Sequence, residues 1–214
     1  MLERMHYETR EEWLAGRNTQ GIGGSEAAAA VGLSPWQTPL DLWKLKTHQT
    51  TPKDISGNAA VAQGVMMEPI LRDFFIRVHA DYTLAYYPYD MLYQMERPWL
   101  FATLDGELTD ANGKRGILEI KTATPNGKAG WDKWGNGQMP QNYFCQTLHQ
   151  LLATGFDFVC LFAALYSMNG DITLREYEIY REDVKADLDW LLEQETEFWG
   201  YVQRFEMPPQ RLIL

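Results

Sequence analysis

The stretch of sequence that decides the fold reads Leu104-Asp105-Gly106 and, eleven residues after the aspartate, Gly116-Ile117-Leu118-Glu119-Ile120-Lys121, so that Glu119 follows Asp105 by fourteen residues. Side chains alternate between the two faces of a strand, so Glu119 and Lys121 share one face while the leucine and isoleucine beside them point into the core. Residues 109–116 have turn composition, which predicts a hairpin with Asp105 on the partner strand beside Glu119. Converging carboxylates suit Mg2+ or Mn2+, and a nearby lysine suits a phosphate or an activated water. The alternative interpretation is a solvated ion pair on a strand.

Length and composition predict a single α/β domain over residues 1–214, with a sizeable core. No apolar stretch reaches the length of a transmembrane helix, and the N-terminus carries acids where a signal peptide needs a basic flank and an apolar run. We therefore expect no membrane contact and a cytoplasmic location. Cys145 and Cys160 lie in apolar sequence without CxxC spacing, which predicts buried structural thiols in a reducing compartment.

The net charge of −10 argues at first against a nucleic-acid partner, because phosphate binding normally needs a basic surface. Ten acidic and three basic residues fall between Glu176 and Glu206, a net of −7 that predicts one long solvated helix and leaves −3 for the rest of the chain. Basic residues cluster instead around the predicted hairpin: Lys114, Arg115, Lys121, Lys128 and Lys133. Local charge decides binding more than total charge does.

Helices are predicted at three places in the first fifty residues, beginning with a short one over Glu8–Leu14. Residues 21–25, Gly-Ile-Gly-Gly-Ser, indicate a flexible turn before an alanine-rich helix, with Ser25 as its N-cap and free backbone amides that suit an anion. Arg17 lies just upstream of this turn. The pair Thr38-Pro39 predicts a further helix with a capped start.

A longer helix is predicted over Gly57–Ala80. Its apolar stripe has five members: Val61, Val65, Leu71, Phe75 and Val78. Glu68 falls on this stripe, where a carboxylate is costly unless it is paired or meets a metal. A bond to a neighbour such as Arg72 and a role in metal binding are the two interpretations of this glutamate.

The remaining elements complete the predicted fold. Strand composition runs over residues 83–94 and 99–104 before the hairpin, and over 158–168 and 172–180 after it. Between them, residues 140–154 predict a helix that carries three polar residues on one face: Tyr143, Gln146 and Gln150. The order of elements predicts a central mixed β-sheet flanked by helices.

Four of these features occur in an order that resembles the core of the PD-(D/E)XK nucleases: Glu68 on a helix, Asp105 and Glu119-x-Lys121 on adjacent strands, and Tyr143-x-x-Gln146 on the next helix. Over roughly residues 10–170 the chain resembles in particular the phage lambda exonuclease-like family of viral alkaline exonucleases. Further segments carry this resemblance: Gly21–Ala27, Leu33–Pro39, Gly64-x-x-x-Glu68, Thr103–Gly106, Leu118–Lys121 and Ala153–Gly155. The departure is Leu104, where the superfamily pattern has a proline that shapes a turn and ligates nothing.

The resemblance implies a restriction-endonuclease-like core and a role for each matched residue. The implied metal ligands are Asp105, Glu119, the main-chain carbonyl of Ile120, and Glu68. Lys121 is then the residue that activates the attacking water, and Gln146 is the residue that positions it. The implied cofactor is Mg2+, with Mn2+ as a substitute and two ions in each site.

The resemblance also implies a pocket for a terminal 5′-phosphate, formed by Arg17, Ser25 and Thr103. An ordinary surface arginine is the other interpretation of Arg17. Three tryptophans are candidates for stacking on bases, although tryptophan is more often a core or interface residue: Trp36, Trp131 and Trp134.

The function implied is a Mg2+-dependent 5′→3′ double-strand DNA exonuclease that releases 5′-mononucleotides and leaves 3′ single strands for recombination. The resemblance further implies a phage or prophage protein acting in a bacterial host cell, a homotrimeric ring around DNA ends, and a single-strand annealing recombinase as partner. The first alternative is a different nuclease of the same fold, either an endonuclease or a repair nuclease with an iron–sulfur cluster. The cluster version is disfavoured because two cysteines cannot supply four ligands to such a cluster. A catalytically silent DNA-binding protein is the second.

Overall fold

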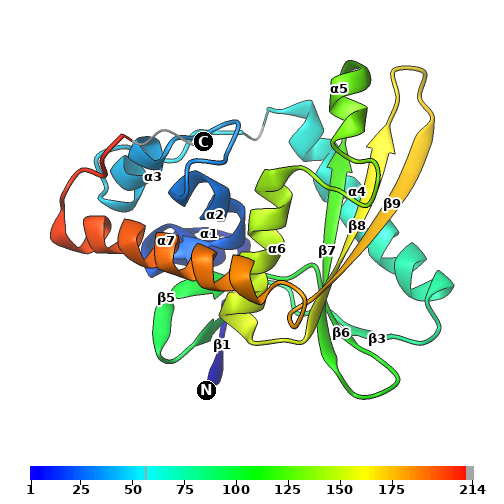
Figure 1. Cartoon of the computed structure of the whole chain (residues 1–214), viewed down its shortest axis with the longest axis horizontal. Helices are drawn as coiled ribbons and strands as arrows, with labels where there is room; N and C mark the ends of the chain where they lie inside the picture. Colours follow the sequence, from blue (N-terminus) through cyan, green and yellow to red (C-terminus); the bar gives the residue numbers. More distant parts are fainter. Residues whose placement is uncertain (56, 211–214) are drawn as a thin grey trace.

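Two mixed β-sheets and seven helices make up the computed structural model, which describes residues 1–55 and 57–210 (Figure 1). The first sheet has the order β1 (Leu2–His6), β4 (Asp90–Gln94), β5 (Arg97–Ala102), β2 (Ile22–Gly23). The second has the order β3 (Thr83–Ala85), β6 (Gly106–Thr109), β7 (Arg115–Ala123), β8 (Phe158–Tyr166), β9 (Ile172–Tyr180). The predicted α/β class with a mixed sheet between helices is confirmed, and the strands are divided between two sheets.

Six helices follow the predicted order along the chain, and a short seventh over Gly127–Asp132 was not predicted. Their bounds are α1 (Arg10–Gln20), α2 (Gly24–Ala30), α3 (Pro39–Lys46), α4 (Ala59–Val78), α5 (Gly127–Asp132), α6 (Gln141–Thr154) and α7 (Lys185–Arg204). Helix α3 begins as predicted, because the Thr38 side chain accepts a hydrogen bond from the backbone N–H of Asp41. Cys145 and Cys160 are buried free thiols, also as predicted.

The predicted hairpin is strands β6 and β7, which pair antiparallel with Gly106 opposite Leu118. Strand β7 then pairs parallel with β8, so the middle of this sheet is covered on both faces. Helix α4 packs on the face that carries Leu118 and Ile120, and α6 packs on the face that carries Ile117 and Val159. Glu119 therefore points toward α6, and it is almost completely buried.

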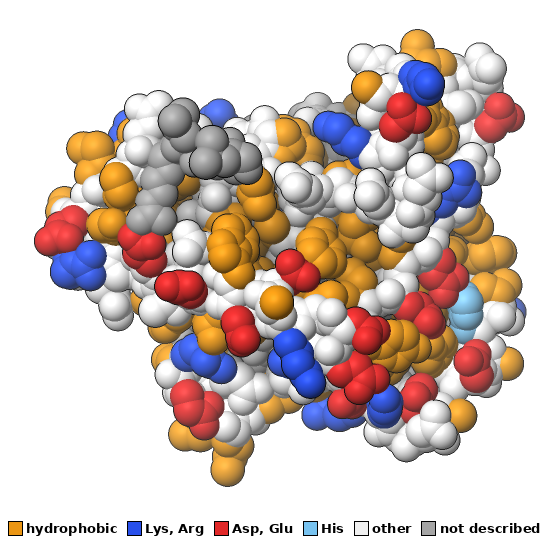
Figure 2. Space-filling view, in the orientation of Figure 1, with side chains coloured by type: hydrophobic (Ala, Val, Ile, Leu, Met, Phe, Trp, Pro, Cys, Tyr) orange, Lys and Arg blue, Asp and Glu red, His pale blue; other side chains and the backbone are white. Residues whose placement is uncertain are grey.

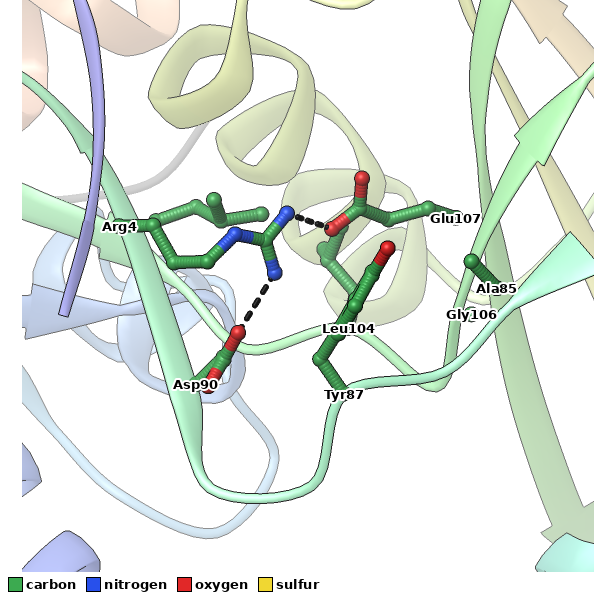
Figure 3. Close-up of a pocket in the computed structure, with 8 residues that line it drawn as sticks. Arg4, Ala85, Tyr87, Asp90, Leu104, Gly106 and Glu107 are labelled. Atoms are coloured by element: carbon green, nitrogen blue, oxygen red, sulfur yellow. Dashed lines mark hydrogen bonds and ion pairs between the residues drawn. The ribbon is translucent and has the colours of Figure 1, made fainter. Parts of the chain in front are cut away.

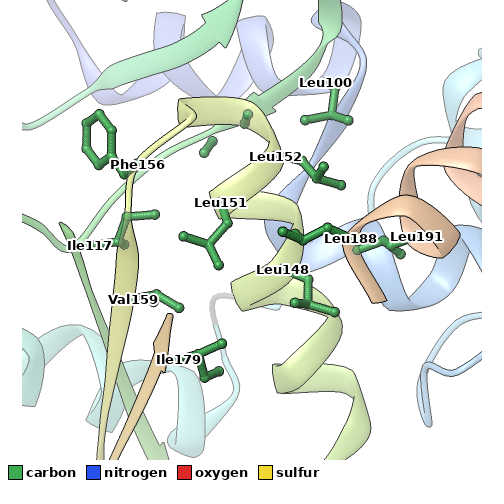
Figure 4. Close-up of a cluster of buried hydrophobic side chains, with 12 residues drawn as sticks. Leu100, Ile117, Leu148, Leu151, Leu152, Phe156, Val159, Ile179, Leu188 and Leu191 are labelled. Atoms are coloured by element: carbon green, nitrogen blue, oxygen red, sulfur yellow. The ribbon is translucent and has the colours of Figure 1, made fainter. Parts of the chain in front are cut away.

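Helix α6 is the centre of the largest buried cluster (Figure 4). Three of its leucines meet side chains from the second sheet, from β5 and from α7: Leu148, Leu151 and Leu152 with Leu100, Ile117, Val159, Ile179, Leu188 and Leu191. This packing leaves another face of α6 for polar contacts with β7.

The two sheets are joined by an arginine. Arg4 on β1 forms an ion pair with Asp90 on β4 at 2.6 Å and a second ion pair with Glu107 on β6 (Figure 3). Leu104, the residue where the nuclease pattern has proline, lines the small pocket at this junction and packs against the main core. Its apolar side chain thus helps to fix the segment that carries Asp105.

Several local predictions near the N-terminus were wrong. Helix α1 extends from Arg10 to Gln20, because Thr9 and Glu12 form a capping box that starts it. Strand β1 was not predicted at all. Residues 22–23 form a buried strand against β5, and Gly23 is the N-cap of α2, so Ser25 lies inside the helix. The Glu26 carboxylate accepts a hydrogen bond from the N–H of Gly23 and caps this helix start.

Two predictions of helix faces were also wrong. On α4, Leu71 and Phe75 are buried, but Val65 and Val78 are 65% and 54% exposed. Val65 lies about 120° around the helix from Leu71, and Val78 is the last residue of the helix. The acidic helix α7 is not solvated all round, since one face packs into the core through Leu188, Leu191, Glu195 and Phe198. No helix in the described part of the chain is long and apolar enough to cross a bilayer.

Candidate active site

Asp105 and Glu119 lie side by side where β7 meets the segment that leads into β6. Asp105 Oδ2 accepts a hydrogen bond of 2.7 Å from the backbone N–H of Ile120, which fixes its carboxylate next to that of Glu119. Burial raises the pKa of Asp105 well above its usual value, and the charges of Glu119 and Glu68 raise it further. The carboxylates are therefore close enough to repel one another.

Glu119 is held by three donors. Its Oε1 accepts from Gln146 Nε2 at 2.6 Å and faces Lys121 Nζ at 2.5 Å, while its Oε2 accepts from Gln150 Nε2 at 2.5 Å. Gln146 and Gln150 stand one helical turn apart on α6 and reach the same carboxylate. Gln150 was predicted to share a face with Gln146 but was not assigned to the site, since the sequence gives no sign that both amides meet Glu119.

Lys121 lies on the same face of β7 as Glu119, as predicted. Burial by itself would lower the pKa of Lys121, but the carboxylates of Glu119 and Asp105 outweigh it and raise the pKa above its ordinary value. Its Nζ also lies 5.3 Å from the centre of the Tyr143 ring. The lysine is therefore a fixed cation between two acids and an aromatic face.

Glu68 reaches this region from α4, on the opposite face of the sheet from Glu119. Its carboxylate forms an ion pair with Arg72 one turn later, which was one of its two predicted interpretations. Arg72 Nε donates to the backbone carbonyl of Asp105 at 2.6 Å, and its guanidinium lies 3.5 Å from the centre of the Tyr86 ring. Arg72 was not predicted to link the acids, and it ties α4 to the segment that carries Asp105.

Gly24 and Gly64, from two of the segments that resemble the exonuclease family, lie where α2 and α4 approach the site. A Cβ on Gly24, in the first turn of α2, would lie 3.4 Å from the Cγ atoms of both Gln146 and Gln150. A Cβ on Gly64 of α4 would lie 3.3 Å from Thr122 Oγ1 on β7. The contact at Gly64 is tighter than a Cβ ordinarily makes, so this position favours glycine, whereas the contacts at Gly24 are ordinary van der Waals packing. Both positions bring their helices, α2 and α4, against the site.

The three predicted phosphate-binding residues lie on the α2 side of the site. Arg17 Nη2 donates to Ser25 Oγ at 3.0 Å, so α1 and α2 bring these two residues together. Burial lowers the pKa of Arg17, and the charges of Glu26, Glu119 and Asp105 act in the opposite direction. Thr103 lies two residues before Asp105, and its carbonyl faces Gln150 Nε2 at 3.5 Å.

The side-chain oxygens at this site are of the kind that bind a divalent cation. Asp105 and Glu119 offer hard oxygen ligands, and a cation between them would offset the repulsion that raises the pKa of Asp105. Gln150 Oε1 is buried without a hydrogen-bond partner among the described residues. In the part of the chain that the structure describes, no three acidic, histidine or cysteine side chains converge into a metal-holding group, because Glu68 is turned to Arg72.

The fold and the order of these groups define a restriction-endonuclease-like α/β domain. Residues 12–157 match the YqaJ-like viral recombinase domain, and the chain belongs to that family. It is 28% identical over 196 residues to the uncharacterized protein YqaJ of Bacillus subtilis (strain 168). That match covers 90% of this chain and 56% of the relative, so the chain spans little more than half the length of that protein.

The structure is similar to an alkaline exonuclease (LHK-Exo) from Laribacter hongkongensis, with a TM-score of 0.61 at 18% identity, over 91% of this chain and 95% of that chain. For LHK-Exo in complex with dAMP the TM-score is 0.59 at 19% identity, with the same coverage of both chains. Together with the family match, this likeness confirms the predicted fold and the predicted resemblance to the lambda exonuclease-like family.

Proposed function

We propose that this chain is a Mg2+-dependent 5′→3′ exonuclease of double-stranded DNA. The observation that carries the proposal is the contact of Glu119 with Lys121 and two glutamines next to Asp105, at a point where α1 and α2 place Arg17 beside Ser25. Membership of a viral recombinase domain family supports DNA as the substrate. The similar structures include an alkaline exonuclease and its complex with dAMP, which supports release of mononucleotides.

Asp105, Glu119 and the carbonyl of Ile120 are the proposed metal ligands, and Glu68 joins them for a second ion once its carboxylate leaves Arg72. When bound, Mg2+, or Mn2+ in its place, supplies stabilisation of the charge that develops on the attacking and leaving oxygens of a phosphodiester. Gln146 and Gln150 hold the buried carboxylate of Glu119 in one orientation by donating a hydrogen bond to each of its oxygens.

Lys121 acts on the water that attacks phosphorus. Its ammonium group is within reach of both acids, so it can donate a hydrogen bond to this water and stabilise the hydroxide that forms. Gln146 positions the same water from α6. Arg17, Ser25 and Thr103 bind the terminal 5′-phosphate, and this places the first phosphodiester bond at the carboxylates. Repeated cleavage leaves a 3′ single strand.

The larger assembly is part of the same proposal. A homotrimer around the DNA end would keep acidic outer surfaces away from the duplex, and a single-strand annealing recombinase would receive the 3′ strand. Action in the cytoplasm of a bacterial host, on phage or prophage recombination, follows from the family resemblance.

Release of acid-soluble nucleotides from a linear 5′-phosphorylated duplex tests the activity. Wild type should release nucleotides with Mg2+ and none in EDTA. Glu119→Gln should lose activity by about a thousandfold or more, because it removes a charge that acts in the transition state. Glu193→Gln, at an exposed position of α7, is the matched control. No release by wild type, or unchanged release by Glu119→Gln, would contradict the proposal.

A further inference from the structure

Trp36 is the one of the three candidate tryptophans whose ring lies open to solvent. It belongs to the segment between α2 and α3 and is 71% exposed, whereas Trp134 is 4% exposed and packs in a buried cluster that also includes the partly buried Trp131. An indole left in water forgoes the free energy of burying a large apolar ring. This position therefore favours an occupant that covers the ring.

The Trp36 ring is placed beside the candidate active site by Tyr143. The ring centres of Trp36 and Tyr143 lie 6.4 Å apart, and Lys121 Nζ lies 5.3 Å from the centre of the Tyr143 ring. The ring of Tyr143 also packs against that of Trp134, with 5.4 Å between the two ring centres. Trp134 is anchored in turn, since its carbonyl accepts a 2.7 Å hydrogen bond from Tyr177 Oη. Trp36 is thus the exposed end of a row of rings that starts in the core and passes the lysine.

The backbone around Trp36 is held in place. Ser34 Oγ accepts hydrogen bonds from the N–H groups of Trp36 at 3.2 Å and Gln37 at 3.3 Å. Directly afterwards, Thr38 and Asp41 form the capping box of α3. The ring is therefore presented by an ordered turn, which reduces the entropy lost when a ligand binds.

We propose that Trp36 is a base-stacking residue, which takes the nucleobase next to the scissile phosphate on its exposed face. A nucleobase fits because it offers a flat π-face joined to a phosphate, and Lys121 and the acid pair lie one aromatic ring away. Ser34 and Gln37, which share a hydrogen-bonded turn with Trp36, are polar, and Pro35 lies between Ser34 and Trp36. Polar side chains beside the ring suit a nucleobase that carries a charged phosphate backbone. This inference rests on the proposed function and names a residue that orients its substrate.

Binding of a duplex with 2-aminopurine as its 5′-terminal base tests the inference in EDTA, where no hydrolysis is expected. Wild type should quench 2-aminopurine fluorescence. Trp36→Ala should lose the quenching and bind the duplex end about tenfold more weakly, whereas Trp36→Phe should retain most of both, because stacking needs only an aromatic face. Trp190→Ala, at a 46% exposed position on α7, should behave as wild type. Wild-type quenching and affinity in Trp36→Ala would overturn the inference.

A parallel digestion with Mg2+ separates this inference from the proposed function. If wild type digests the duplex and Trp36→Ala binds and quenches normally, the stacking role is wrong and the exonuclease proposal stands. If quenching depends on Trp36 but wild type releases no nucleotide, the stacking role stands and the exonuclease proposal is wrong. Failure of wild type to bind any duplex end would overturn both.

Discussion

The acids of the site differ in how their charge is supported. Glu119 has an ammonium group and two amide donors, whereas among the described residues Asp105 has one hydrogen-bond donor, the N–H of Ile120. Burial and the neighbouring carboxylates consequently raise the pKa of Asp105. An acid whose folded pKa is raised contributes stability at low pH, and this contribution is lost as the pH rises through the folded value.

Asp105→Asn should therefore stabilise the metal-free protein. At pH 8 in EDTA its Tm should exceed that of wild type, by about 2–4 °C for each kcal/mol of repulsion removed, and the difference should shrink as the pH falls toward about 4. With Mg2+ the order of the two proteins should reverse. At a free Mg2+ concentration of about one hundred times Kd, binding should raise the free energy of unfolding of wild type by about 2.7 kcal/mol and that of the variant by much less. Thermal melts at both pH values with and without Mg2+ measure this. Equal Mg2+ stabilisation of the two proteins would show that Asp105 is not a ligand.

Arg17 offers a second prediction for a single residue. Its contact with Ser25 predicts that wild type digests 5′-phosphorylated ends faster than 5′-hydroxyl ends. Arg17→Ala should remove about ten- to a hundredfold of that preference, since a charge-assisted hydrogen bond contributes about 1.5–3 kcal/mol. Arg10→Ala, exposed at the start of the same helix, is the control. If Arg17→Ala slows both substrates equally, Arg17 provides general attraction to DNA instead of a pocket.

Among the elements, α6 connects the site to the core. One face supplies Gln146 and Gln150 to Glu119, and another carries His149, which is completely buried together with Glu195 of α7. His149 Nδ1 lies 2.7 Å from Glu195 Oε1, and Nε2 lies 2.9 Å from the carbonyl of Phe101. Both ring nitrogens face acceptors, so the imidazolium form satisfies both. Burial by itself would lower the pKa of His149. The charge of Glu195 and the hydrogen bonds to Glu195 and the Phe101 carbonyl outweigh this effect, so the pKa of His149 is raised.

Glu195→Ala should lower the free energy of unfolding by about 3–5 kcal/mol at pH 6, because it leaves a buried cation without its partner. A raised histidine pKa gives stability that is present below about 6.5 and lost as the pH rises through the folded value. The cost of the substitution should accordingly decrease at high pH. Denaturant titrations at pH 6 and pH 10 measure it, with Glu193→Ala as the exposed control on α7. A loss under 1 kcal/mol at pH 6 would show that the pair is not ionised.

Local chemistry made some elements predictable and left others hidden. The turn residues 109–116 predicted the β6–β7 hairpin, and Thr38 predicted the start of α3. Strand β1 depends on pairing with β4, which lies nearly ninety residues later in the chain, so its own composition does not reveal it. The buried face of α7 was missed because Glu195 looks like a surface acid until His149 is known to face it.

At the scale of the whole molecule, the site joins parts of the chain that are distant in sequence. Helices α1 and α2 bring Arg17 and Ser25, the β6–β7 region brings the acids and Lys121, and α6 brings the glutamines. The order of motifs predicted these residues apart from Gln150, but it did not predict that Glu68 and Glu119 lie on opposite faces of the sheet, because helix placement across a sheet depends on topology. On the face shown in Figure 2, acidic and basic side chains are interspersed with exposed apolar ones, so net charge alone does not describe the surface.

A time course on three DNA substrates tests the central claim most directly: linear duplex labelled at the 5′ ends, the same duplex labelled at the 3′ ends, and a covalently closed circle, each with Mg2+. We predict that the 5′ label appears at once as a mononucleotide, that the 3′-labelled strand persists, and that the circle stays intact. Asp105→Ala and Glu119→Ala should leave all three substrates unchanged. Cleavage of the circle, earlier release of the 3′ label, or near wild-type turnover by purified Asp105→Ala would contradict the account.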